Sequence, residues 1–104
     1  MKHNKLVRDK IPEIILADGR EVSTRILNDK EYEAELEKKL VEECKEVLEA
    51  KGEHRLEELA DVLEVMMALA KNDGYALDDI IVAARQKREK RGAFDKKIFL
   101  VEDK

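Results

Sequence analysis

Apolar residues recur every three or four positions over most of this chain, which is the period of an amphipathic helix. The pattern predicts three long helices, at about 28–52, 54–73 and 77–91, and a short helix at 10–19. A glycine lies at or just after the end of each segment, as is common where helices stop. The helix at 54–73 is apolar over the widest arc, so it is expected to be the most buried.

Two other segments predict short strands. The segment 21–27 places β-branched residues and Ile26 on one face, and 96–102 reads "KKIFLVE". These two strands are expected to pair as a small ribbon. The predicted fold is therefore mainly α, an antiparallel helical bundle with a minor two-stranded β ribbon, in a single domain spanning 1–104.

The composition of the chain changes this picture in two ways. It is 43% hydrophobic, 44% charged and only 4% aromatic, so a 104-residue monomer would have a thin core and self-association is expected. One cysteine, Cys44, cannot form an internal disulfide, and no apolar stretch approaches the roughly 20 residues of a membrane span. The N-terminus carries no apolar signal core. We expect a reduced, cytoplasmic, soluble protein with no membrane partner.

Charge is distributed unevenly along the chain. Residues 31–64 carry 13 acidic and 5 basic side chains, whereas 85–92 carry five basic and one acidic. The net charge of −4 disfavours a nucleic-acid polymer as the partner. An acidic middle followed by a basic cluster is a pattern that the function must explain.

Four carboxylates are candidates for a metal site. Turning the helix by 100° per residue places Glu43 and Glu46 beside the apolar stripe of 28–52. On the next helix, Glu58 falls inside the apolar arc and Asp61 at its edge. Facing each other, the four would repel unless a hard cation lay between them, and Mg²⁺ (or Mn²⁺ in its place) prefers oxygen ligands. From spacing alone, solvated helix faces are an equally good interpretation.

Two observations favour the metal site. An unpaired carboxylate on the apolar side of a helix, as at Glu58, is costly. On the third helix Lys87, Arg88 and Arg91 continue the line of the apolar stripe beyond Ala84, which suggests an anionic ligand near that end. The alternative is that these cations simply lie at a helix C-terminus, where the negative end of the helix macrodipole favours positive charge.

The motifs resemble a known superfamily. "EECKE" at 42–46 followed by "ELAD" at 58–61 is similar to the E-E-x-x-E … E-x-x-D signature of the MazG-like all-α nucleoside triphosphate pyrophosphatases, relatives of the dimeric dUTPases and of phosphoribosyl-ATP pyrophosphohydrolase. "NKLVRDKIPEII" at 4–15 and "KREKRGAFDKKIFL" at 87–100 resemble the opening and closing segments of a short house-cleaning subfamily. The resemblance covers essentially the whole chain.

The resemblance implies an all-α bundle that often dimerises and that hydrolyses the α–β phosphoanhydride of an NTP, with Mg²⁺, to NMP and pyrophosphate. It implies metal ligation by Glu43, Glu46, Glu58 and Asp61. Glu42, Glu43 and Glu46 become the candidates for catalysis, since any carboxylate not committed to metal, Glu42 or Glu46 included, could be the base. The phosphate-binding residues it implies are Lys87, Arg88, Arg91, Lys5, Arg8 and Lys10.

Two alternatives stay open at the level of sequence. The substrate could be phosphoribosyl-ATP or another phosphoribosyl nucleotide. The chain could also be a catalytically silent nucleotide-binding or oligomeric helical module. No Gly-rich phosphate loop is present, so a P-loop mechanism is excluded.

Overall fold

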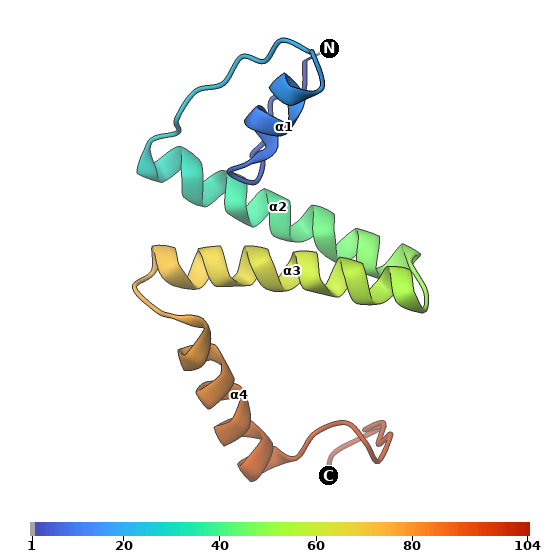
Figure 1. The fold of residues 1–104 in the computed structure, drawn as a ribbon. Coiled ribbons are helices and arrows are strands. Elements are labelled where there is room, and N and C mark those ends of the chain that lie inside the picture. Colours follow the sequence, from blue (N-terminus) through green and yellow to red (C-terminus); the bar gives the residue numbers. More distant parts are fainter. Residues whose placement is uncertain (1) are drawn as a thin grey trace.

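The computed structural model describes residues 2–104 and contains four helices in this range (Figure 1). α1 spans Ile11–Ala17, α2 spans Asp29–Glu49, α3 spans Glu53–Asn72 and α4 spans Leu77–Arg91. All four predicted helices are confirmed, with bounds that differ from the expected ones by at most three residues. α2 and α3 lie side by side as an antiparallel hairpin, and they form the only extensive helix–helix packing among the described residues.

Local hydrogen bonds fix where the hairpin begins. The side chain of Asn28 accepts a hydrogen bond from the backbone N–H of Glu31 (2.9 Å), and the Glu31 carboxylate accepts one from the N–H of Asn28 (3.2 Å). This reciprocal capping box satisfies two donors that the first turn of a helix leaves unpaired. Arg25 adds two hydrogen bonds to the Glu31 carboxylate, at 2.8 and 3.2 Å.

The turn between α2 and α3 is short and depends on a glycine. Gly52 has a φ of +59°, a conformation that L side chains rarely adopt. Nε of Arg55 donates to the carbonyl oxygens of Val47 (3.2 Å) and Ala50 (2.9 Å). These bonds satisfy acceptors that the end of α2 leaves free, so the register between the two helices is set at this turn.

The core lies in the seam of the hairpin and is very small. Leu36 and Val65, exposed to 3% and 8%, are the buried apolar side chains of residues 2–104. The sequence predicts that one apolar stripe of α2 is buried, made of Leu36, Leu40, Cys44, Val47 and Leu48. In the structure the stripe is rotated: Leu36, Leu40 and Val47 face the seam, whereas Cys44 and Leu48 are exposed. This rotation brings Glu43 to the seam and leaves an apolar ridge uncovered.

The predicted β ribbon is wrong for the chain as the structure describes it. Segments 21–27 and 96–102 contain no strand. The first segment joins α1 to α2, and the second follows α4 at the opposite end of the molecule (Figure 1). Strands need neighbouring backbone at about 4.8 Å for their hydrogen bonds, and two segments separated in this way have no partner. Within residues 2–104, no helix combines the length and the apolar character needed to cross a membrane.

The chain is elongated. Its radius of gyration is 18.0 Å, and its extents are 60 × 32 × 24 Å, whereas a compact domain of this length has a radius of gyration of about 13 Å. The difference comes from α4 and the C-terminal segment, which extend away from the hairpin (Figure 1). The helical composition expected from the sequence is therefore confirmed, but a closed bundle is not formed by this single chain.

Candidate metal centre

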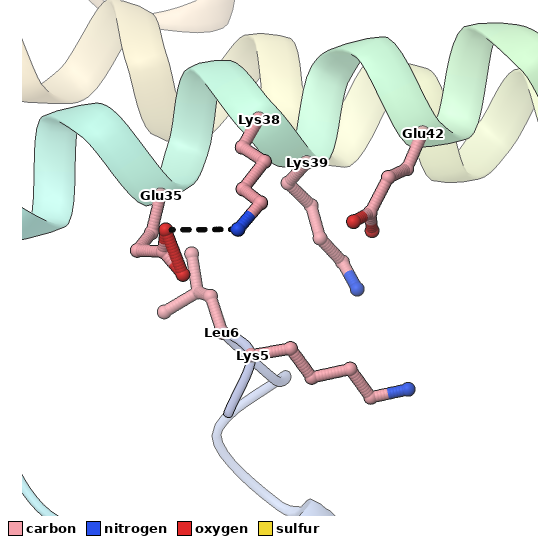
Figure 2. A pocket seen from close by; sticks show the side chains of 6 residues that line it. All are labelled: Lys5, Leu6, Glu35, Lys38, Lys39 and Glu42. Atoms are coloured by element: carbon pink, nitrogen blue, oxygen red, sulfur yellow. Dashed lines mark ion pairs between the residues drawn. The ribbon is translucent and has the colours of Figure 1, made fainter. Parts of the chain in front are cut away.

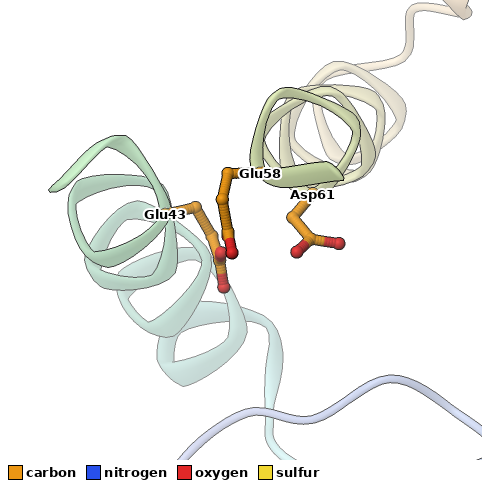
Figure 3. Close-up of side chains that lie close together, drawn as sticks. All are labelled: Glu43, Glu58 and Asp61. Atoms are coloured by element: carbon orange, nitrogen blue, oxygen red, sulfur yellow. The ribbon is translucent and has the colours of Figure 1, made fainter. Parts of the chain in front are cut away.

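Three carboxylates converge across the α2–α3 seam. Glu43 extends from α2, and Glu58 and Asp61 extend from α3 towards it (Figure 3). One oxygen of each lies within 4.8 Å of one oxygen of the other two. The two α3 residues share a face because they are three positions apart. The antiparallel turn at Gly52 brings that face opposite Glu43.

The cluster is partly shielded from solvent. The side chain of Glu43 is only 12% exposed, and Glu58 and Asp61 are half-buried. The Oε2 atoms of Glu43 and Glu58 are buried and have no hydrogen-bond partner among the described residues. A buried acceptor without a partner costs about 1–3 kcal/mol, and more when it is charged, so these two oxygens are the least satisfied atoms of the seam.

Mutual repulsion changes the proton affinity of these groups. Partial burial raises the pKa of Glu43, and the neighbouring carboxyl group of Glu46 raises it further. A hydrogen bond with Glu46 raises the pKa of Glu58, and partial burial adds to the effect. Both shifts mean that the cluster retains protons more tightly than isolated glutamates do. A divalent cation would replace those protons and relieve the same repulsion.

Two cations of the chain already approach the cluster. Nζ of Lys39 lies 3.8 Å from Oε1 of Glu43, one turn earlier on α2. Nη2 of Arg8, on the segment before α1, donates to Oδ1 of Asp61 at 2.6 Å, and its Nη1 lies 3.8 Å from Oε1 of Glu64. In Glu43 and in Asp61, the basic side chain approaches one carboxylate oxygen and leaves the second oxygen without a basic partner within residues 2–104.

The donor set fits a hard divalent cation. It offers carboxylate oxygens from three side chains, without sulfur or imidazole, and oxygen-only ligation is preferred by Mg²⁺ and Mn²⁺. The two orphaned oxygens of Glu43 and Glu58 provide acceptors that no protein donor fills. Three protein ligands also leave coordination positions for water and phosphate, as Mg²⁺ sites commonly do. Glu43, Glu58 and Asp61 could therefore hold a metal ion through carboxylate oxygens.

The remaining predicted carboxylates occupy two different places. Glu46 interacts with both Glu43 and Glu58, although it is exposed and lies outside the set of three that meet within 4.8 Å. Beside it lies an open hollow lined partly by Glu46, Glu58 and His54. Glu42 is exposed, lies outside the cluster and lines a small pocket with Lys5 (Figure 2).

The predicted basic residues are also divided between two ends of the molecule. Arg8 contacts the cluster, Lys5 lies in the small pocket beside α2, and Lys10 is exposed at the start of α1. α4, by contrast, runs away from the hairpin, so its basic end is not brought to the cluster within one chain (Figure 1). The exposed residues at that end are Lys87, Arg88 and Arg91.

Sequence patterns did not single out several residues around the cluster. Lys39 precedes Glu43 by four positions, and this i, i+4 spacing of opposite charges on a helix predicts the ion pair that the two residues form. Lys38 and Lys39 also line the pocket with Lys5 (Figure 2). No sequence signal links Arg8 to Glu64, because the two are brought together only by the path of the N-terminal segment over the hairpin.

Comparisons with known proteins add little to this description. No family model matches the chain, and no solved structure matches it. A protein of Mycolicibacterium smegmatis described only as uncharacterized is 54% identical over 43 residues, which is 41% of this chain. The match spans 44% of that relative, less than half of its length. The molecule is thus defined by its own features, as an all-α protein with an acidic cluster at a helix hairpin.

Proposed function

We propose that this chain is a Mg²⁺-dependent nucleoside triphosphate pyrophosphohydrolase, which cleaves the α–β phosphoanhydride and yields NMP and pyrophosphate. The observation that carries the proposal is the cluster of Glu43, Glu58 and Asp61 with its two buried, unpartnered oxygens. Mg²⁺ held there would activate water and neutralise charge on phosphate oxygens. The order of the acidic motif and its flanking segments in the sequence supports the same class.

The chain's own residues supply the rest of the site in this proposal. Glu46 is exposed and lies near enough to Glu43 and Glu58 to raise the pKa of both. This position suits it either to join the ligands or to accept a proton from the attacking water. The adjacent hollow offers room for a substrate beside the carboxylates. Arg8 and Lys39 supply positive charge next to a triphosphate.

The proposal is tested by a pyrophosphate-release screen over canonical and modified NTPs and dNTPs with Mg²⁺, together with phosphoribosyl-ATP. We expect turnover that EDTA abolishes. Asp61→Asn and Glu43→Gln, which keep the shape of the side chain and remove its charge, should each reduce turnover at least about 100-fold, since even residues that only orient a metal ligand cost 10–100-fold. Retention of the helical circular-dichroism spectrum shows that the fold is intact.

The matched control is Glu37→Gln, an exposed carboxylate of α2 that lies outside the cluster and does not line the adjacent hollow. It should retain full turnover. Wild-type rates in Asp61→Asn and Glu43→Gln would contradict the assignment of the cluster. The absence of turnover on every substrate, with Mg²⁺ and with Mn²⁺, would favour a catalytically silent binding module instead.

The proposal includes a second copy of the chain. The accessible surface is 9868 Å², whereas a compact monomer of 12.0 kDa has about 6,000 Å². The excess of roughly 3,900 Å² exceeds the roughly 1,000–2,500 Å² that each partner of an obligate dimer buries. A row of apolar residues lies on a side of α3 outside the seam, at the 3–4 spacing of a coiled coil. This row consists of Leu56, Leu59, Leu63, Met66 and Ala70.

A homodimer is the occupant that fits this surface. The α3 row is self-complementary in character, apolar and without charges of its own, so a second α3 can pack against it about a two-fold axis. α3 would then be covered on both faces, which accounts for its being apolar over a wide arc. In such a dimer, the exposed basic end of α4, which makes few contacts within its own chain, would form part of the two-chain assembly.

A further inference from the structure

The N-terminal segment 2–10 is attached to both helices of the acidic cluster. Leu6 is half-buried and lies against Lys38 and Lys39 of α2 (Figure 2). Two residues later, Arg8 reaches α3 and bonds to Asp61 at 2.6 Å. The segment has no regular secondary structure before residue 9, so its position depends on these side-chain contacts.

The bond from Arg8 has the geometry of an orienting contact. It engages Oδ1 of Asp61 and is supported on its other nitrogen by Glu64, 3.8 Å away and one turn further along α3. Oδ2 of Asp61 accepts no hydrogen bond from residues 2–104. Glu43 shows the same division: Lys39 lies near Oε1, while Oε2 is buried and unpartnered.

We infer that Arg8 is a positioning residue of the metal centre, which holds Oδ1 of Asp61 so that Oδ2 is left for the cation. The inference rests on the proposed function, because it takes the acidic cluster as the metal site. It adds a coupling that the carboxylates alone do not have: cation binding and ordering of segment 2–10 support each other. Thermodynamic linkage makes the two effects equal in size.

Two physical effects of Arg8 on cation affinity oppose each other. Its positive charge repels a divalent cation, which weakens binding and is screened by salt at this exposed position. Its hydrogen bond fixes the rotamer of a ligand, and loss of such an outer contact typically costs 10–100-fold in metal affinity. We expect the second effect to dominate, with a net loss near the lower end of that range.

The test measures Mn²⁺ affinity directly by electron paramagnetic resonance, without substrate, so its readout is independent of turnover. Arg8→Met keeps much of the apolar stem and removes both the charge and the donors, and we expect binding about tenfold weaker. Arg8→Lys keeps the charge and one donor group, and its affinity should fall between those of Arg8→Met and the wild type. Arg20→Gln, which removes an exposed guanidinium paired with Asp18 at 3.2 Å, is the matched control and should bind as the wild type does.

Amide hydrogen exchange of segment 5–10 supplies the reciprocal measurement. Mg²⁺ should slow exchange there in the wild type and in Arg20→Gln, and have little effect in Arg8→Met. Tighter Mn²⁺ binding in Arg8→Met, or faster exchange when Mg²⁺ is added, would show that Arg8 competes with the cation and would overturn the inference. Unchanged affinity in Arg8→Met would overturn it too, while leaving the proposed function intact. A wild-type chain that binds neither Mn²⁺ nor Mg²⁺ would instead remove the proposed function itself.

Discussion

The α2–α3 hairpin and the α4 region are similar in charge content but differ in how much of their apolar surface the structure buries. Both are highly charged, although α4 separates its apolar and polar residues onto different faces much less than α2 and α3 do. In the hairpin the apolar stripes meet each other, bury Leu36 and Val65, and bring carboxylates together. In α4 the stripe meets almost nothing: Ile81 and Val82 remain 42% and 48% exposed, and the following residues Phe94 and Phe99 remain 97% and 87% exposed.

The difference shows that periodicity identifies a helix without identifying its partner. A three-residue connection at Gly52 forces α2 and α3 to be antiparallel neighbours. The connection from α3 to α4 leaves α4 directed away, with few contacts back to α3. Exposed apolar area of this extent usually marks an interaction surface. In the proposed function, the hairpin would be the metal-binding unit, and the apolar row of α3, together with α4, would be the dimer-forming unit.

The largest expected effect comes from placing a charge on the dimer-forming unit. Leu59→Glu buries a carboxylate in the proposed α3–α3 contact, where an unpaired charge is costly. We expect the dimer to dissociate in sedimentation experiments at micromolar concentration. Because the isolated chain buries so little, the thermal transition should also become broad and non-cooperative.

The control for this change is Lys71→Glu, an exposed residue near the end of α3 and outside the apolar row. It should remain dimeric, with a melting temperature that rises with protein concentration as the wild type's does. A wild-type chain that sediments as a monomer, with a melting temperature independent of concentration, would contradict the proposed dimer.

An intermediate effect is expected in the hairpin when pH and Mg²⁺ are varied. The pKa values of Glu43 and Glu58 are raised above the ordinary 4.5, so the folded state binds protons more tightly than the unfolded state. Their contribution to stability is full below pH 4.5 and is lost as the pH rises through the raised values. In EDTA, stability attributable to the cluster should therefore fall on going upward from pH 4.5, and Glu43→Gln should reduce that slope.

Mg²⁺ should reverse this loss in the wild type. At a concentration 100 times its dissociation constant, a ligand of the folded state adds about 2.7 kcal/mol, measured by chemical denaturation at pH 7.5. Glu43→Gln should gain much less. An equal gain in both proteins would contradict Mg²⁺ binding at Glu43. A pH slope that the substitution does not alter would contradict the raised pKa of Glu43 as its cause. Hydrogen bonds from Arg25 and Asn28 lower the pKa of Glu31. Its contribution to stability therefore has the opposite sign of pH dependence: it is present above pH 4.5 and is lost as the pH falls.

The smallest effect is expected at the start of the hairpin. Asn28→Ala removes the acceptor that caps α2, and loss of such a cap costs about 1 kcal/mol. Stability should fall by that amount in denaturant melts, with no change in Mn²⁺ affinity, because the cap is several turns from Glu43. For comparison, the N-cap position of α4 is Ala76, which has no side-chain acceptor, although the Asp79 carboxylate accepts a hydrogen bond from the N–H of Ala76 at 2.8 Å. A change in Mn²⁺ affinity in Asn28→Ala would mean that the whole of α2 must be in place to form the site.

Much of the candidate site was predictable from helical geometry. Placing Glu43 beside one stripe, and Glu58 and Asp61 beside the next, requires only 100° per residue and a short antiparallel connection. The structure brings these three together. It does not bring Lys87, Arg88 or Arg91 to them, because a charge pattern does not specify the direction in which α4 leaves α3.

The sequence by itself determined the four helices, because apolar spacing and caps act over a few residues. It also determined the candidate carboxylates, because three-residue spacing fixes them on one face. Only the tertiary structure decided which ridge of α2 is buried, that segments 21–27 and 96–102 lie too far apart to pair, and that Arg8 reaches Asp61 across 53 positions of sequence. These outcomes depend on contacts between distant segments, and the free energy of such contacts is set by the path of the whole chain rather than by local pattern.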